Sequence, residues 1–85
     1  MTDWIYVTGG HELTPIKVDG LDVWKHDWTS LPGDPVSVKD PLYGQDFRFW
    51  VYSITDGRRT VTFAAGEFSN GTWGFFQPRS NERCS

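Results

Sequence analysis

The most informative stretch of the sequence is DFRFWVYSITDGRRTVTFAAGEFSNGTWGFFQ, residues 46–77. Asp56-Gly57 and Asn70-Gly71 divide it into three runs rich in β-branched and aromatic residues, the types that favour strands. Both dipeptides favour the tight turns of β-hairpins, because their residues tolerate positive φ angles. The stretch therefore predicts a three-stranded antiparallel meander.

Two-residue hairpin loops fix the register of the strands that they join. On this register Tyr52 faces Val61 across the first hairpin, and Gly66 faces Phe75 across the second. Because side chains alternate along a strand, both faces of the meander then carry apolar residues. The residues expected on one face are Trp50, Tyr52, Ile54, Val61, Phe63 and Phe76, and those on the other are Phe47, Phe49, Val51, Ala64, Phe68, Trp73 and Phe75.

A meander with one solvated face would alternate apolar and polar side chains. Because both faces of this meander are apolar, each of them must be covered. One face can be the core of the domain. The other must be covered by residues 1–45, by another subunit or by a ligand. We expect a second copy of the chain, with Phe47, Phe49, Phe68 and Phe75 at the interface. A bulge at Ala65-Gly66 would bend the sheet toward a barrel.

The earlier part of the chain adds another hairpin signal. Asp19-Gly20 separates two short runs, and on a two-residue loop Val18 faces Leu21. The same register places Lys17 opposite Asp22 and Ile16 opposite Val23. An opposite-charge pair beside two apolar pairs is favourable in a hairpin.

The remaining segments complete an all-β plan. Residues 4–8 (WIYVT) form an expected strand, and residues 28–46 hold three of the five prolines, so they are expected to be loop with a short strand around Val36. The sequence predicts a small antiparallel barrel or sandwich of six to seven strands built on hairpins, with little or no helix.

The length of 85 residues favours one domain, with residues 1–78 as the folded part and residues 79–85 as a polar tail that frays. Domains this small bury only about 60–65% of their unfolded surface and commonly need a disulfide, a metal or a partner. A single cysteine excludes an internal disulfide, and no zinc-type spacing occurs, so no metal or cofactor is expected. Five Trp, three Tyr and six Phe instead favour a homo-oligomer, most simply a dimer.

The charge pattern limits the partners. A net charge of −3 and a pI near 5.1 argue against nucleic-acid binding, which needs a basic surface. No apolar run reaches membrane-spanning length and no secretion signal is recognisable, so we expect a cytoplasmic protein with no membrane contact. Residues 1–46 carry three Lys and eight acids, whereas residues 47–85 carry five Arg and three acids. This asymmetry is either chance in a short chain or an arginine-bearing face that meets an acidic partner surface.

Three aromatic residues form a candidate ligand groove. Trp28 and Tyr43 lie in the proline-containing stretch, where sheet pairing buries an aromatic ring less readily. Together with Trp73 they would line a groove for a small molecule, a sugar or a peptide. The competing interpretation is that the three rings cap the barrel or fill a subunit interface.

Two polar residues complete the candidate binding residues. His26 lies where a strand gives way to loop, and Arg48 lies at the end of one sheet face, where arginine suits a protein interface. A hydrolase or isomerase using His26 with Asp27 or Asp46 is a minor alternative. Asp27 fits it poorly, because neighbours on a strand point to opposite faces. Cys84 lies in the polar tail, where no general base is positioned to activate its thiol. No catalytic residue is therefore expected.

These observations favour a non-enzymatic module for protein interaction or self-association. The alternative is a module that binds a small molecule, a sugar or a peptide in an aromatic-lined groove. A further alternative is an immunity or inhibitor protein whose acidic first half meets a basic toxin.

Overall fold

The computed structural model describes residues 3–12 and 14–78, so the expected tail at residues 79–85, with Cys84, lies outside the described residues. The elements are β1 (Trp4–Gly10), β2 (Lys17–Val18), β3 (Leu21–Asp22), the 3-10 turn η1 (Val23–Lys25), β4 (Thr29–Ser30), β5 (Val36–Lys39), β6 (Asp46–Thr55), β7 (Thr60–Glu67) and β8 (Trp73–Pro78). The described residues hold no α-helix, and the predicted all-β class is confirmed.

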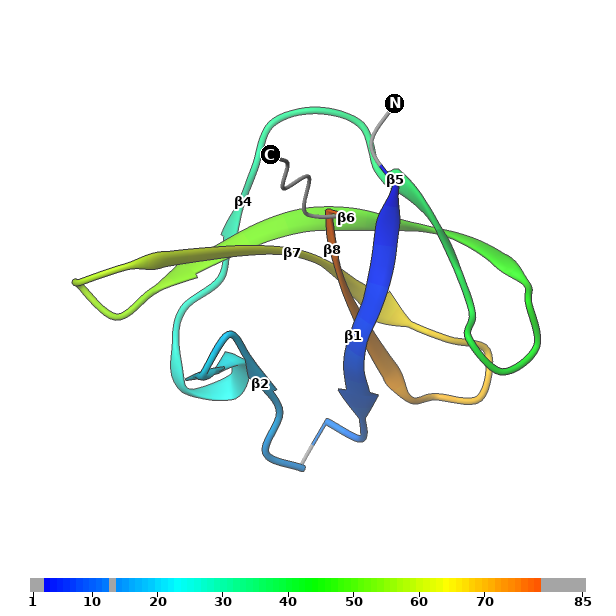
Figure 1. Ribbon diagram of the computed structural model, residues 1–85, viewed down its shortest axis with the longest axis horizontal. Coiled ribbons are helices and arrows are strands. Elements are labelled where there is room, and N and C mark those ends of the chain that lie inside the picture. Colours follow the sequence, from blue (N-terminus) through cyan, green and yellow to red (C-terminus); the bar gives the residue numbers. More distant parts are fainter. Residues whose placement is uncertain (1–2, 13, 79–85) are drawn as a thin grey trace, which may run out of the picture.

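Six strands form one antiparallel sheet in the order β1-β8-β7-β6-β4, with β5 also paired to β6 (Figure 1). The long strand β6 has room for two partners on one edge, because β5 pairs with its first four residues and β4 with two of the later ones. At one end of the sheet β1 lies beside β5, but no ladder joins them among the described residues. The sheet is therefore strongly curled without closing into a barrel.

The β2–β3 hairpin has the predicted register. Val18 lies opposite Leu21 and Lys17 opposite Asp22. Asp19 adopts a φ of 52° and Gly20 a φ of 85°, as a two-residue hairpin loop requires. This hairpin is separate from the large sheet and lies to one side of it (Figure 1).

The predicted register between β6 and β7 is wrong by two residues, because Tyr52 lies opposite Phe63 and not Val61. The loop spans residues 56–59, and the carboxylate of Asp56 accepts backbone N–H hydrogen bonds from two of them at 2.8 and 3.0 Å. These bonds stabilise a four-residue loop in place of the two-residue one. A slip of two residues leaves every side chain on its predicted face.

The predicted register between β7 and β8 is wrong by one residue, which has a larger effect. Gly66 lies opposite Gly74, and Phe75 lies opposite Ala65. Five residues separate the strands, and the loop is closed by a hydrogen bond from the Phe68 N–H to the Thr72 carbonyl at 2.8 Å. A slip of one residue exchanges the two faces of a strand. The predicted sides of Trp73, Phe75 and Phe76 are therefore reversed.

Both faces of the curled sheet are covered by the chain itself. On one face the β2–β3 hairpin and η1 cover a core of Ile16, Val18, Leu21, Val23, Ile54, Val61, Phe63, Ala65 and Phe75. On the other face β5 and the start of β1 cover Val38, Phe49, Ala64, Phe68 and Phe76. Of the four residues expected at a subunit interface, Phe49, Phe68 and Phe75 are buried within the single chain and Phe47 is half-buried. The second cover therefore comes from residues 1–45 of the same chain, which was one of the three alternatives, and not from the second copy that we expected there.

Two opposed glycines let aromatic rings lie directly on the backbone of the sheet. A Cβ on Gly66 would come within 2.5 Å of the Phe49 ring, and a Cβ on Gly74 would clash with the Phe68 ring in the same way. A glycine inside a strand commonly marks such a close approach. Phe49 and Phe68 can pack at this depth only because both positions lack a side chain.

Replacing Gly66 or Gly74 with alanine should lower the free energy of unfolding by about 1–3 kcal/mol, because the ring above it must move. Urea denaturation followed by tryptophan fluorescence measures the loss. Gly10→Ala is the matched control, since a Cβ on this β1 glycine meets nothing closer than 3.7 Å. An equal loss in all three variants would contradict this account of the core.

Candidate functional site

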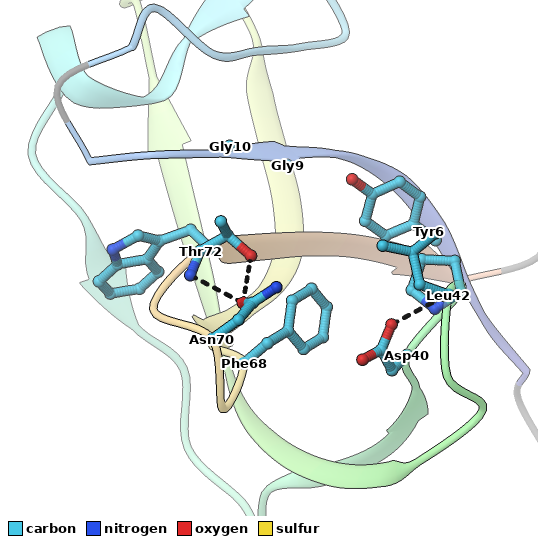
Figure 2. A pocket seen from close by; sticks show the side chains of 10 residues that line it. Tyr6, Gly9, Gly10, Asp40, Leu42, Phe68, Asn70 and Thr72 are labelled. Carbon is cyan, nitrogen blue, oxygen red and sulfur yellow. Dashed lines mark hydrogen bonds between the residues drawn. The ribbon is translucent and has the colours of Figure 1, made fainter.

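A groove of about 430 Å³ opens between β1, the β5–β6 turn and the β7–β8 loop (Figure 2). Its lining residues are Tyr6, Gly9, Gly10, Asp40, Pro41, Leu42, Phe68, Asn70, Thr72 and Trp73. The volume lies in the range of small-ligand sites, which combine apolar walls with a few placed polar groups. The groove is therefore the candidate functional site.

Strand β1 supplies Tyr6 to this groove. A bulge between Tyr6 and Thr8 leaves Val7 without a partner in the β8 ladder, and bulges commonly redirect side chains. The Tyr6 ring packs edge-on against Phe76 at 5.5 Å between centroids. Its hydroxyl occupies the space beside Gly9, where a Cβ would come within 2.6 Å of it. The bare backbone of Gly9 thus permits this position of the phenol.

The turn between β5 and β6 is built around Asp40. Its Oδ1 accepts hydrogen bonds from the backbone N–H groups of Leu42 at 2.8 Å and Tyr43 at 3.4 Å. Its own N–H donates to the Gln45 carbonyl at 2.8 Å, and its carbonyl accepts from the Gly44 N–H at 2.9 Å. These four bonds fix the turn and hold Leu42, which is 77% exposed, at the rim of the groove.

Asp40 is the only charged residue that is buried in the described part of the chain, at 5% exposed. The hydrogen bonds that its carboxylate accepts from described residues both end on Oδ1, and none ends on Oδ2. Figure 2 shows this second oxygen directed toward the side of the groove where Phe68 lies. The carboxylate therefore serves the turn with one oxygen and faces the groove with the other.

The β7–β8 loop forms the opposite wall. Asn70 Oδ1 accepts hydrogen bonds from the Thr72 N–H at 3.1 Å and the Thr72 hydroxyl at 2.7 Å, which holds the loop against the sheet. Phe68 lies over Gly74 and presents its ring to the groove. The indole Nε1 of Trp73 is buried without a hydrogen-bond partner among the described residues. This wall therefore combines two aromatic rings with the polar side chains of Asn70 and Thr72.

The electrostatics of the groove follow from these positions. Burial and the negative charge of Asp40 both raise the pKa of the Tyr6 phenol above its usual value, so this hydroxyl stays neutral through the physiological range. None of the described residues that line the groove is basic. The groove therefore combines one carboxylate, one neutral phenol and the polar side chains of Asn70 and Thr72 with aromatic rings.

The structure separates the three aromatics that were expected to share a groove. Trp73 lines the groove described above. Trp28 instead packs in the core that the β2–β3 hairpin and η1 cover, where its ring centroid lies 5.8 Å from that of Trp73. Tyr43 is 73% exposed in the β5–β6 turn, and the described ring contacts of Trp28 do not include it.

Trp28 is the centre of an aromatic cluster. Its ring contacts those of Trp24, Tyr52, Phe63, Trp73 and Phe75, at centroid distances of 5.1 to 5.8 Å. Its Nε1 donates to the Val23 carbonyl at 2.7 Å, which ties the ring to η1. Trp28 thus joins the η1 segment to the large sheet.

The predicted polar residues lie elsewhere. His26 ends η1 and is half-buried, and Arg48 is exposed on β6 opposite Ser37. Neither of them lines the groove. In residues 3–12 and 14–78, no group of three His, Cys, Asp or Glu side chains is placed to hold a metal.

Sequence reasoning missed Tyr6, Asp40 and Leu42 as groove residues. The only local signal was the Asp40-Pro41 step, which is typical of a turn. These residues meet because the curled sheet brings β1 beside β5. No spacing in the sequence encodes that proximity.

Comparisons with known proteins add no assignment: no protein-family model, no curated protein and no solved structure matches the chain. No helix of the described residues is long and apolar enough to cross a membrane.

Replacing Trp28 with alanine should lower the free energy of unfolding by about 3–5 kcal/mol, as expected for the loss of a large aromatic residue from a core. Trp28→Phe should cost less, because a ring remains while the hydrogen bond to Val23 is lost. Thermal and urea denaturation give both values. Trp50→Ala is the control, because Trp50 is 49% exposed. If Trp50→Ala were as costly as Trp28→Ala, the cluster would not have this central role.

Asp40→Asn should lower the pKa of Tyr6, because the neutral amide no longer disfavours the phenolate, while burial still holds this pKa above its usual value near 10. A spectrophotometric pH titration at the tyrosinate band measures it, with Tyr6→Phe identifying the Tyr6 signal. The raised pKa means that the contribution of Tyr6 to stability is complete below pH 10 and is lost as pH rises through the folded-state value. An unchanged titration in Asp40→Asn would show that the two groups do not interact.

Proposed function

We propose that the protein is a small binding module, without a catalytic step, that holds a segment of a partner protein in the groove between β1, the β5–β6 turn and the β7–β8 loop. The observation that carries this proposal is the arrangement of apolar side chains at the rim, Tyr6 and Leu42, around the buried carboxylate of Asp40. Interfaces that bind proteins combine apolar anchors and aromatic residues with a few placed polar groups in this way.

The rim is held in place before any partner arrives. Leu42 is 77% exposed, and two backbone hydrogen bonds of the turn converge on the Asp40 carboxylate beneath it. A preorganised apolar side chain loses little conformational entropy when it is covered by a partner. The exposure of Leu42 is therefore better explained by a role in binding a partner than by a side chain that the fold leaves unburied.

A second candidate is a small-molecule or sugar ligand in the same groove. The volume of about 430 Å³ supports it, because it lies within the range of such sites. Self-association remains a special case of the first candidate. A second copy would use the groove or other surface residues, since Phe49, Phe68 and Phe75 are already buried by the chain itself.

Peptides selected from a displayed random library against the protein should lose at least about tenfold in affinity when Leu42 or Tyr6 is replaced with alanine, which is the loss expected for an interface anchor. Tyr43→Ala is the matched control, because Tyr43 is equally exposed on the same turn but does not line the groove. Fluorescence anisotropy gives the affinities. If the selected peptides tolerated Leu42→Ala and Tyr6→Ala, or depended on Tyr43 instead, the groove would not be the binding site.

A further inference from the structure

We propose that the groove receives the lysine or arginine side chain of the partner segment, with the cationic group against Asp40. This inference rests on the proposed function and specifies the chemistry of the partner.

The carboxylate of Asp40 lies in an unusual position for an ionisable group. At 5% exposed it is more than nine-tenths buried, and such groups are normally paired with an opposite charge or fully hydrogen-bonded. Oδ1 has two backbone donors, but Oδ2 has none among the described residues. Oδ2 is therefore an unpartnered acceptor, directed into a groove that opens to the surface.

The chain does not supply the missing cation from its described residues. The basic residues there are Lys17, Lys25, Lys39, Arg48, Arg58 and Arg59, and none of them lines the groove. Lys39 is the neighbour of Asp40 in sequence, but its Nζ lies 3.9 Å from the exposed carboxylate of Asp46. The guanidinium of Arg59 donates to the Asp19 carbonyl. A cation that reaches Asp40 therefore has to come from outside this part of the chain.

The walls of the groove suit a basic side chain along its whole length. Pro41 and Leu42 offer apolar surface to the methylene stem, which lysine and arginine commonly bury while the charged end finds a polar partner. The rings of Tyr6, Phe68 and Trp73 line the same space, and aromatic faces attract cations. The neutral Tyr6 hydroxyl provides a second acceptor in the same groove.

An uncharged or acidic side chain fits the groove less well. An apolar side chain would remove water from Oδ2 without replacing its hydrogen bonds, and leaving a buried charge in this state is costly. An acidic side chain would add repulsion to the same loss. The carboxylate therefore selects for a cation as much as it attracts one.

The test compares synthetic pentapeptide pools with a fixed central residue and randomised flanks, captured on the immobilised protein and quantified by mass spectrometry. The central residue is arginine, its neutral isostere citrulline, lysine, Nε-acetyllysine or leucine. We expect the arginine and lysine pools to be retained at least tenfold more than their neutral counterparts. Asp40→Asn should abolish this preference, because asparagine keeps an oxygen acceptor for the turn and removes the charge.

Each outcome separates the two proposals. Equal retention of charged and neutral pools, with retention still lost in Leu42→Ala, would overturn the basic side chain and leave the binding module standing. Retention that is unchanged by Leu42→Ala in every pool would overturn both.

N-acetylarginine amide, assayed as a competitor, distinguishes the source of the cation in the groove. Competition as effective as that of the arginine peptides would show that a free cation, and not a protein segment, is the occupant. The melting temperature of Asp40→Asn, unchanged within a few degrees, shows that the variant is folded.

Discussion

The structure depends on the close approach of aromatic rings to bare backbone. Gly66 and Gly74 face each other across β7 and β8, and the rings of Phe49 and Phe68 lie where side chains would otherwise stand. This contact lets β6 curl over the sheet and brings β5 to the neighbourhood of β1. A similar close contact occurs at Gly9, where the absence of a Cβ leaves space for the Tyr6 hydroxyl. The curl that buries the second sheet face therefore also creates the groove, because Phe68 and Tyr6 form two of its walls.

The sequence was informative wherever local chemistry decides structure. The Asp19-Gly20 hairpin formed with its predicted register, and the three-stranded meander formed where it was predicted. The errors arose in loop lengths. The carboxylate of Asp56 stabilises a four-residue loop, and the bond from Phe68 to Thr72 closes a five-residue one. Both loops contain a dipeptide that also favours two-residue turns, so the dipeptide alone does not determine the register.

Most residues of the groove could not be predicted from the sequence, because they meet only through the curl of the sheet. Trp73 was identified in advance, but Tyr6 and Asp40 are brought together by the curl of the whole sheet, which depends on contacts between distant residues. Asp40 also had an ordinary explanation as a turn residue, and this explanation is correct for Oδ1. Only two features indicate a second role: the side chain is buried, and Oδ2 accepts no hydrogen bond from the part of the chain that the structure describes. Two apolar sheet faces suggested a dimer, whereas the chain covers both faces itself.

The described residues form a groove with the Asp40 carboxylate inside it, and none of their basic side chains pairs with that carboxylate. This arrangement is tested by NMR, from the chemical shifts of the backbone amide and tryptophan indole N–H groups. The protein is titrated with N-acetylarginine amide and, separately, with N-acetylcitrulline amide. With the arginine compound, and not with the citrulline compound, we expect saturable shifts at Leu42, at residues 68–72 and at the Trp73 indole. The same shifts with both compounds, or shifts that avoid the groove, would show that the carboxylate does not select a cation there.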